Sequence, residues 1–156
     1  MSQYEINRAA LIAYIESQGW NFTVRADNDE RYVARMGFNV GNRLRSIDIL
    51  AIADSTCIQS IGVSPINAKP EDYGMVVEYI TRANFGLKVG NFEFDYSDGE
   101  VRYQSYLSSW DGQPNRENIE VVVDMPYHMF KKYGDGLVKA LMGFGTPEAD
   151  IAAAES

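Results

Sequence analysis

The chain has 156 residues, and its 14 Lys and Arg against 22 Asp and Glu give a formal net charge of −8 at pH 7. A negative surface repels nucleic-acid phosphates and anionic lipid headgroups, and the longest cationic run is only Lys131-Lys132. We therefore expect no nucleic-acid or membrane partner. Hydrophobic residues make up 46% of the chain, which is enough for one core, so we expect a single domain over residues 1–156.

Cys57 is the one cysteine, so a disulfide within the chain is excluded, which fits a reducing compartment. The N-terminal residues lack the basic-then-apolar order of a signal peptide. No apolar stretch approaches the roughly 20 residues that a membrane-spanning helix needs. These features together predict a cytoplasmic protein.

The first half of the chain predicts a helix followed by four strands. Residues 2–5, Ser-Gln-Tyr-Glu, form a capping box that begins a helix, and Gly19 ends it. From Trp20 the apolar period changes to two, and Trp20, Phe22 and Val24 are predicted to form the buried face of a strand. Further strands are predicted at 32–40, 44–53 and 57–63. The third has apolar residues on both faces and is expected to be central, and tight turns predict an antiparallel meander.

The second half predicts a helix, a hairpin and a long helical segment. Pro70 fits the first turn of a helix that ends near Asn84, and Asp98-Gly99 between alternating apolar runs predicts a hairpin. Apolar residues from 119 to 141 keep a helical period, which Pro126 is expected to kink or divide, with Gly134 and Gly136 as a second weak point. A short helix follows residue 146. The order α-β-β-β-β-α-β-β-α(-α) predicts an α+β fold, a twisted antiparallel sheet packed against helices.

The residue types that carry chemistry are sparse. His128 is the only histidine, and we identify no nearby carboxylate to orient it, so it is interpreted as a surface or half-buried residue. Cys57 is interpreted as a buried, unreactive thiol. Asp95, Asp98 and Glu100 flank the hairpin turn and are interpreted as turn residues rather than calcium ligands. We therefore expect no catalytic residue, no metal site and no cofactor.

Aromatic residues gather on the late hairpin and just beyond it. Most are expected to pack in the core, because cross-strand aromatic pairs stabilise sheets. Their pattern occupies both faces of the strand, however, and Tyr and Trp are enriched at interface hot spots. The candidate partner surface therefore comprises Tyr96, Tyr103, Tyr106 and Trp110.

Four segments carry a resemblance to a known family: residues 84–87 (Asn-Phe-Gly-Leu), 89–95 (Val-Gly-Asn-Phe-Glu-Phe-Asp), 98–103 (Asp-Gly-Glu-Val-Arg-Tyr) and 143–149 (Gly-Phe-Gly-Thr-Pro-Glu-Ala). Together with the leading helix and the order of elements, they resemble the YbjN-like family, bacterial proteins classed as candidate sensory-transduction regulators. Residues 40–69 match less well. The resemblance implies a fold similar to type III secretion chaperones, a homodimer, and binding of an extended segment of a client protein. It supplies no catalytic residues.

Two functions remain open from the sequence. The first is a non-enzymatic protein-interaction domain, a regulator or chaperone-like adaptor of another bacterial protein, acting as a dimer through a groove beside the sheet. The alternative is a small-molecule-binding domain or an unrecognised enzyme, with a pocket between sheet and helices. A deep polar pocket would favour the alternative.

Overall fold

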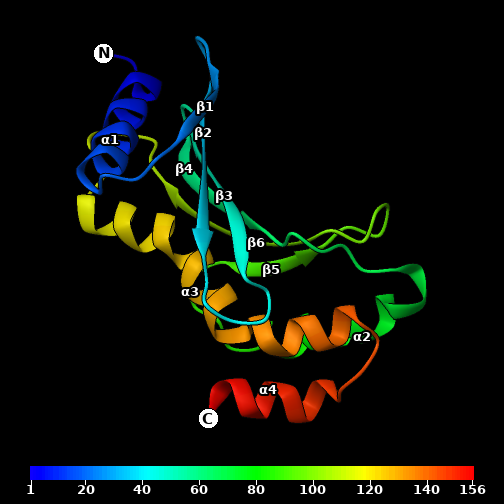
Figure 1. Ribbon diagram of the computed structural model, residues 1–156. Helices are drawn as coiled ribbons and strands as arrows, with labels where there is room; N and C mark the ends of the chain where they lie inside the picture. The colour runs from blue at the N-terminus through cyan, green and yellow to red at the C-terminus, as the bar shows by residue number, and fades with distance from the viewer.

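The helices and strands follow the predicted order. The computed structural model describes residues 1–156. Its elements are α1 (Gln3–Ser17), β1 (Thr23–Asp27), β2 (Tyr32–Asn39), β3 (Ser46–Ala53), β4 (Cys57–Val63), the 3₁₀ turn η1 (Pro70–Asp72), α2 (Tyr73–Asn84), β5 (Asn91–Phe94), β6 (Val101–Ser108), α3 (Arg116–Leu141) and α4 (Pro147–Glu155) (Figure 1). The predicted α+β fold is thereby confirmed.

The six strands form one antiparallel sheet in the order β1-β2-β3-β4-β6-β5. The last hairpin is therefore added to the meander through β6, with the short β5 at the edge. As predicted, β3 lies between two neighbours, with Ile49 opposite Met36 of β2 and Gly62 of β4. None of the helices combines the length and the apolar character needed to cross a membrane.

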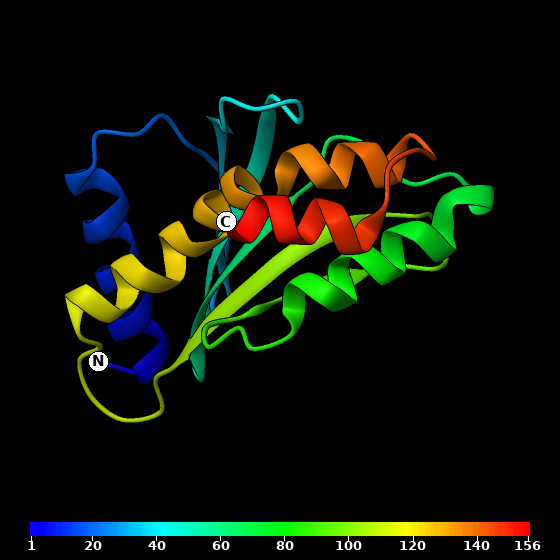
Figure 2. The ribbon, with the colours of Figure 1, turned by 90° about the horizontal axis from the view of Figure 1, so that it is seen from below.

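The core lies between one face of the sheet and the helices. One cluster of 30 buried residues draws on all four helices and on every strand except β1. α1 lies at one end of the molecule, and α2 and α4 lie at the other, where they pack with the second half of α3 (Figures 1 and 2). α3 spans both ends and contacts β4 and β6 on the way.

The opposite face of the sheet has no helix over it. A second, small cluster on that face consists of Val33, Ile52 and Ile61, with Ala26, Leu50 and Val63 packed beside them. All of these residues belong to strands β1 to β4. Val33, Ile52 and Ile61 are buried in the monomer, whereas Ala26, Leu50 and Val63 keep partial exposure, so the apolar area left on this face comes from these three residues.

α3 passes through Pro126 without a break, and it changes direction midway (Figure 2). Proline lacks the N–H that would bond to the Val122 carbonyl one turn earlier. The hydroxyl of Ser105 on β6 donates to that carbonyl at 2.6 Å, and Ser60 on β4 donates to the Val123 carbonyl at 3.1 Å. Both serines are fully buried. The predicted kink is thus present, and serines of the sheet bond to the carbonyls beside it.

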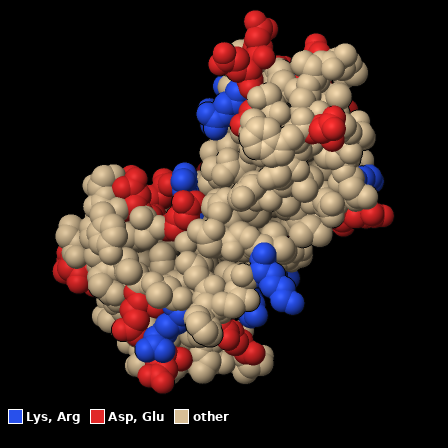
Figure 3. Space-filling model, turned by 180° about the vertical axis from the view of Figure 1, so that it is seen from behind, with Lys and Arg blue, Asp and Glu red and all other residues tan.

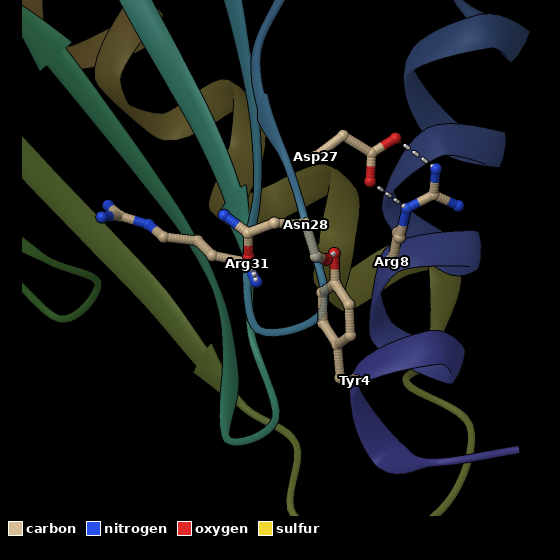
Figure 4. A network of polar contacts seen from close by, with 5 residues as sticks. All are labelled: Tyr4, Arg8, Asp27, Asn28 and Arg31. Atoms are coloured by element: carbon tan, nitrogen blue, oxygen red, sulfur yellow. Dashed lines mark hydrogen bonds and ion pairs between the residues drawn. The ribbon is translucent and has the colours of Figure 1, made fainter.

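α1 is tied to the hairpin of β1 and β2 by polar contacts. The guanidinium of Arg8 donates to both carboxylate oxygens of Asp27, at 2.8 and 2.5 Å, and the hydroxyl of Tyr4 donates to the Asn28 carbonyl at 2.8 Å. Figure 4 shows these side chains reaching from α1 to the hairpin, while Arg31 points away from them. The capping box predicted at Ser2 and Glu5 is present.

Two details of the predicted elements are wrong. The first strand begins at Thr23 rather than Trp20, and Val24 is 47% exposed rather than buried. Trp20 and Phe22 pack against the core from the segment before the strand, and a register shift between Val24 and Ala26 twists this edge strand away from the core. The third strand begins at Ser46 rather than Leu44.

Gly134 and Gly136 are not a weak point of α3, because both lie inside the continuous helix. They are places of close approach. A Cβ at Gly134 would lie 2.4 Å from the Asn42 amide, and one at Gly136 would lie 2.5 Å from the Tyr79 hydroxyl. That hydroxyl donates to the Tyr133 carbonyl at 2.6 Å. The small residues therefore allow α2 and the loop after β2 to lie against the helix.

Candidate partner-binding groove

Half of strand β6 lacks a neighbour on one side. β4 pairs with β6 from Arg102 to Ser108, but β5 pairs with it only from Val101 to Gln104. Residues 105–108 therefore have a paired strand on one side only. In an antiparallel strand, backbone N–H and C=O groups point to both sides, so an unpaired edge presents groups ready to bond to another strand.

The chain leaves the sheet at Gly90, and this is why β5 is short. Gly90 has φ +71°, and a Cβ there would lie 2.1 Å from the Gln104 carbonyl oxygen, so this tight turn requires glycine. The Tyr103 hydroxyl donates to the Val89 carbonyl and holds the preceding segment in place. The amide side chain of Asn84 both accepts from and donates to the backbone of Phe92. These contacts fix the point at which the edge of β6 becomes free.

A groove of about 530 Å³ runs beside this free edge. It lies between the end of β6, the segment before β5 and the first turns of α3. Its lining residues are Lys88, Val89, Gly90, Tyr106, Leu107, Ser108, Asn118, Val121 and Val122. Tyr106 and Val121 are large apolar side chains that are exposed in the groove, at 58% and 44%. The groove therefore combines an unpaired strand edge with exposed apolar walls.

The four predicted partner-surface residues do not form one surface. Tyr106 lies in the groove, and Trp110, 71% exposed, follows two residues after the end of β6. Tyr96 is 66% exposed but lies in the turn at the other end of the hairpin, where it stacks edge-on with Tyr73 and Phe94. In Figure 1 that turn and the loop after β6 lie on opposite sides of the molecule.

Tyr103 is a correction to the predicted surface. Its side chain is 0% exposed and stacks edge-on with Phe92 in the core. Because side chains alternate along a strand, Tyr103 faces the helices with Val101 and Ser105, whereas Tyr106 faces the other way. The alternation was visible in the sequence, and it separates the two tyrosines that the sequence analysis grouped together.

Cys57 lies half-buried at the start of β4. Burial and the nearby Asp54 carboxylate raise the pKa of its thiol. The carboxylate of Asp54 also accepts from the backbone N–H groups of Thr56 and Cys57, so it serves the turn before the strand. Arg31 acts in the opposite direction, but the net shift of the pKa is upward, so the protonated form of the thiol is favoured.

The carboxylates of the hairpin turn accept hydrogen bonds from backbone N–H groups, as predicted for turn residues. Asp95 accepts from the N–H of Ser97 at 2.8 Å, and hydrogen bonding to the side chain and the backbone of Ser97 lowers the pKa of its carboxyl group. Asp98 accepts from the N–H of Glu100 at 2.9 Å. Both are side-chain turns of the kind that Asp favours. No group of three or more His, Cys, Asp or Glu side chains is placed to hold a metal ion.

His128 is exposed on α3, in agreement with the sequence interpretation. Asp124, a carboxylate that was not identified as a neighbour of His128 from the sequence, lies four residues earlier on the same helix, where side chains share a face. Both residues border a separate aromatic pocket of about 290 Å³. The spacing of Asp124 and His128 indicates a shared helix face in the sequence, but it does not indicate the distant residues that complete this hollow.

The surface carries both signs of charge in small groups. On the face in Figure 3, Lys and Arg lie among Asp and Glu, and neither sign forms a continuous patch. All five ion pairs involve side chains that keep some exposure to solvent. This face shows no basic stripe of the kind that tracks a phosphate backbone.

Comparison with known families gives one finding. The family model YbjN, described as "Putative bacterial sensory transduction regulator", matches residues 7–138. No curated protein matches the chain. The matched residues run from the first turns of α1 almost to the end of α3, and they include all six strands and the groove. The chain therefore belongs to the YbjN family.

Proposed function

We propose that this protein is a non-enzymatic regulator that binds an extended segment of another bacterial protein in the groove beside β6. The observation that carries the proposal is the free edge of residues 105–108. An extended segment that pairs with such an edge gains main-chain hydrogen bonds, and its alternate side chains enter neighbouring hollows.

The lining residues of the groove favour a client segment that has apolar side chains at every second position. Tyr106 and Val121 offer exposed apolar area on either side of the edge. Tyrosine is enriched among the residues that dominate interface energies, because it contributes a large contact area with few rotatable bonds. Lys88 and Asn118 supply polar contacts in the same groove.

A displayed library of random linear peptides tests the proposal. Peptides selected on the protein are expected to protect the backbone amides of residues 105–108 from hydrogen exchange. Val121→Asp places a charge in the groove wall and is expected to weaken their binding roughly tenfold or more, the usual effect of losing an interface hot spot.

Tyr96→Ala is the control, because it removes an exposed aromatic side chain from the turn between β5 and β6, outside the groove. It is expected to leave peptide binding unchanged. Selected peptides that protect another part of the protein, or that tolerate Val121→Asp, would refute the groove as the binding site. Failure to select any peptide would argue against an extended client.

We also propose that two copies pair through the face of the sheet that has no helix over it. The partly exposed apolar residues Ala26, Leu50 and Val63, which pack beside the buried Val33, Ile52 and Ile61, support this surface, because a second copy would remove their remaining apolar area from water. Light scattering on a size-exclusion column is expected to give twice the chain mass for the wild type and the single mass for Leu50→Glu. Val24→Glu, an exposed apolar residue of the edge strand, is the control.

We place this regulator in the cytoplasm and without nucleic-acid partners. The single cysteine and the net charge of −8 support both statements. Cell fractionation tests the location. A gel-shift titration at low salt tests nucleic-acid binding, and a salt-dependent shift would contradict the proposal.

A further inference from the structure

A second hollow lies between the sheet and α3, away from the groove. It has a volume of about 290 Å³, close to the lower end of ligand pockets, which are typically about 300–1,000 Å³. Its lining residues are Trp20, Phe38, Asn39, Ile49, Val123, Asp124, Tyr127 and His128. They come from the segment after α1, from β2 and β3, and from α3, so the fold itself shapes the hollow.

Three aromatic rings wall the pocket. Trp20 and Phe38 meet edge-on with ring centres 5.1 Å apart, and Phe38 and Tyr127 meet at 6.1 Å in the same manner. Each of the three is partly buried against the core, so each keeps some surface toward the pocket. Edge-on packing holds neighbouring rings at steep angles, and aromatic faces carry partial negative charge. The walls therefore suit an apolar or cationic group rather than an anion.

A single carboxylate lies among these rings. Oδ1 of Asp124 accepts from the Tyr14 hydroxyl at 2.8 Å, which is the one hydrogen bond that this carboxylate makes within the protein. It has no Lys or Arg within ion-pairing distance. Burial raises the pKa of this carboxyl group, with a further contribution from Glu120, while the Tyr14 hydrogen bond and His128 lower it. The charged form of Asp124 is thus partly desolvated and has no Lys or Arg paired with it.

We infer that this pocket binds a small organic cation, an ammonium group that carries apolar substituents, with its charge beside Asp124 and its substituents against Trp20, Phe38 and Tyr127. Aromatic walls attract cations through their negative faces, and such cages recognise alkylated ammonium groups. The free oxygen of Asp124 supplies the opposite charge, and a bound cation compensates a carboxylate that burial leaves poorly solvated.

The surroundings favour a cation over a neutral ligand of the same shape. The ammonium group of Lys131 lies 5.8 Å from the Tyr127 ring centre, so this ring is able to interact with a cation, and a ligand cation would compete with Lys131 for it. The guanidinium of Arg116 lies over the Tyr14 ring in a similar way, at 5.6 Å. A neutral apolar ligand would cover Asp124 without pairing it, and burying an unpaired charge is costly.

Fluorescence of Trp20 provides the readout. The protein has two tryptophans, and Trp110→Phe removes the exposed one, so that the remaining signal comes from the pocket wall. This variant is titrated with choline and with n-butylammonium. Each cation is compared with its neutral counterpart, 3,3-dimethylbutan-1-ol for choline and 1-butanol for n-butylammonium. We expect at least one cation to bind about tenfold or more tightly than its neutral counterpart.

Asp124→Asn tests the carboxylate with little change of shape, because the amide oxygen can still accept from Tyr14. It is expected to abolish the preference for the cation. Glu120→Gln removes a charge one turn earlier on α3, outside the pocket, and is expected to retain that preference. Circular dichroism confirms that both variants are folded.

Two results would overturn the inference. One is equal binding of cation and neutral counterpart. The other is the absence of any Trp20 response to either cation while the wild-type fold is intact. The inference goes beyond the proposed partner binding and does not depend on it, because the peptide test reads residues 105–108 and this test reads Trp20. Either proposal can fail while the other stands.

Discussion

The serines of the sheet should matter to stability because Pro126 leaves a carbonyl of α3 without its helical partner. Ser105 donates to the Val122 carbonyl at 2.6 Å, and both residues are buried. Ser105→Ala removes the donor and leaves a buried acceptor unpaired, which costs about 1–3 kcal/mol of unfolding free energy. With a urea m-value of about 1–3 kcal/mol/M for small proteins, the midpoint should fall by roughly 1 M.

Pro126→Ala should make that serine less important. Alanine at position 126 supplies the N–H that proline lacks, and this N–H can bond to the Val122 carbonyl. In the Pro126→Ala background, Ser105→Ala is therefore expected to cost about 1 kcal/mol less than it does in the wild type. Urea unfolding followed by circular dichroism on the four proteins of this double-mutant cycle measures the difference.

Ser60 supplies the control for the cycle. Its hydroxyl donates to the Val123 carbonyl, whose helical donor is the N–H of Tyr127, which the substitution at Pro126 leaves in place. Ser60→Ala should thus cost the same in both backgrounds. Equal costs for Ser105→Ala in the two backgrounds would refute the reasoning, because the Ser105 bond would then not replace the one lost at proline.

Three further changes have expected outcomes. Gly90→Ala should lower the melting temperature more than Gly86→Ala does. Both glycines have positive φ, but of the two only a Cβ at Gly90 would clash with the backbone, at the Gln104 carbonyl. Equal decreases in melting temperature would contradict this close approach. Arg8→Ala should lower the unfolding free energy by under about 1 kcal/mol, since its ion pair with Asp27 is exposed. A larger decrease in urea unfolding would show that this pair contributes more than a surface ion pair does. Burial raises the pKa of Asp124 in the folded state, so the folded protein holds this proton to a higher pH than the unfolded chain does. The unfolding free energy of the wild type, relative to that of Asp124→Asn, should therefore fall as the pH rises from below the usual carboxyl pKa to above the raised one. An increase over that pH range in urea unfolding would contradict the direction of the shift.

The order of elements was predictable because each begins or ends at a residue with a local effect. Ser2 and Glu5 cap α1, Gly19 takes φ +70° at its end, and the Asp98-Gly99 turn joins β5 to β6. The family resemblance, carried by such structural motifs, is confirmed by the match over residues 7–138. Signals of this kind act over a few residues, so a single sequence contains them in full.

The groove and the aromatic pocket could not be predicted from the sequence, because each is formed by segments that lie far apart in the chain. The free edge of β6 depends on pairing with β4, more than 40 residues away in the chain, and on the point at which Gly90 leaves the sheet. The aromatic pocket joins Trp20 to Tyr127 across more than 100 residues. Local periodicity reports which face of a strand is buried, as it does for Tyr103, but it does not say which distant segments meet there.

One turn of α3 contributes residues to both the groove and the aromatic pocket. Val121 and Val122 line the groove, the next two residues, Val123 and Asp124, line the aromatic pocket, and Pro126 follows directly. A cation that shifts this turn changes the walls of both hollows at once. By thermodynamic linkage, such a ligand would alter affinity for a client by the same factor by which the client alters affinity for the ligand. If both proposed ligands bind, this turn would connect the cation pocket to the client groove.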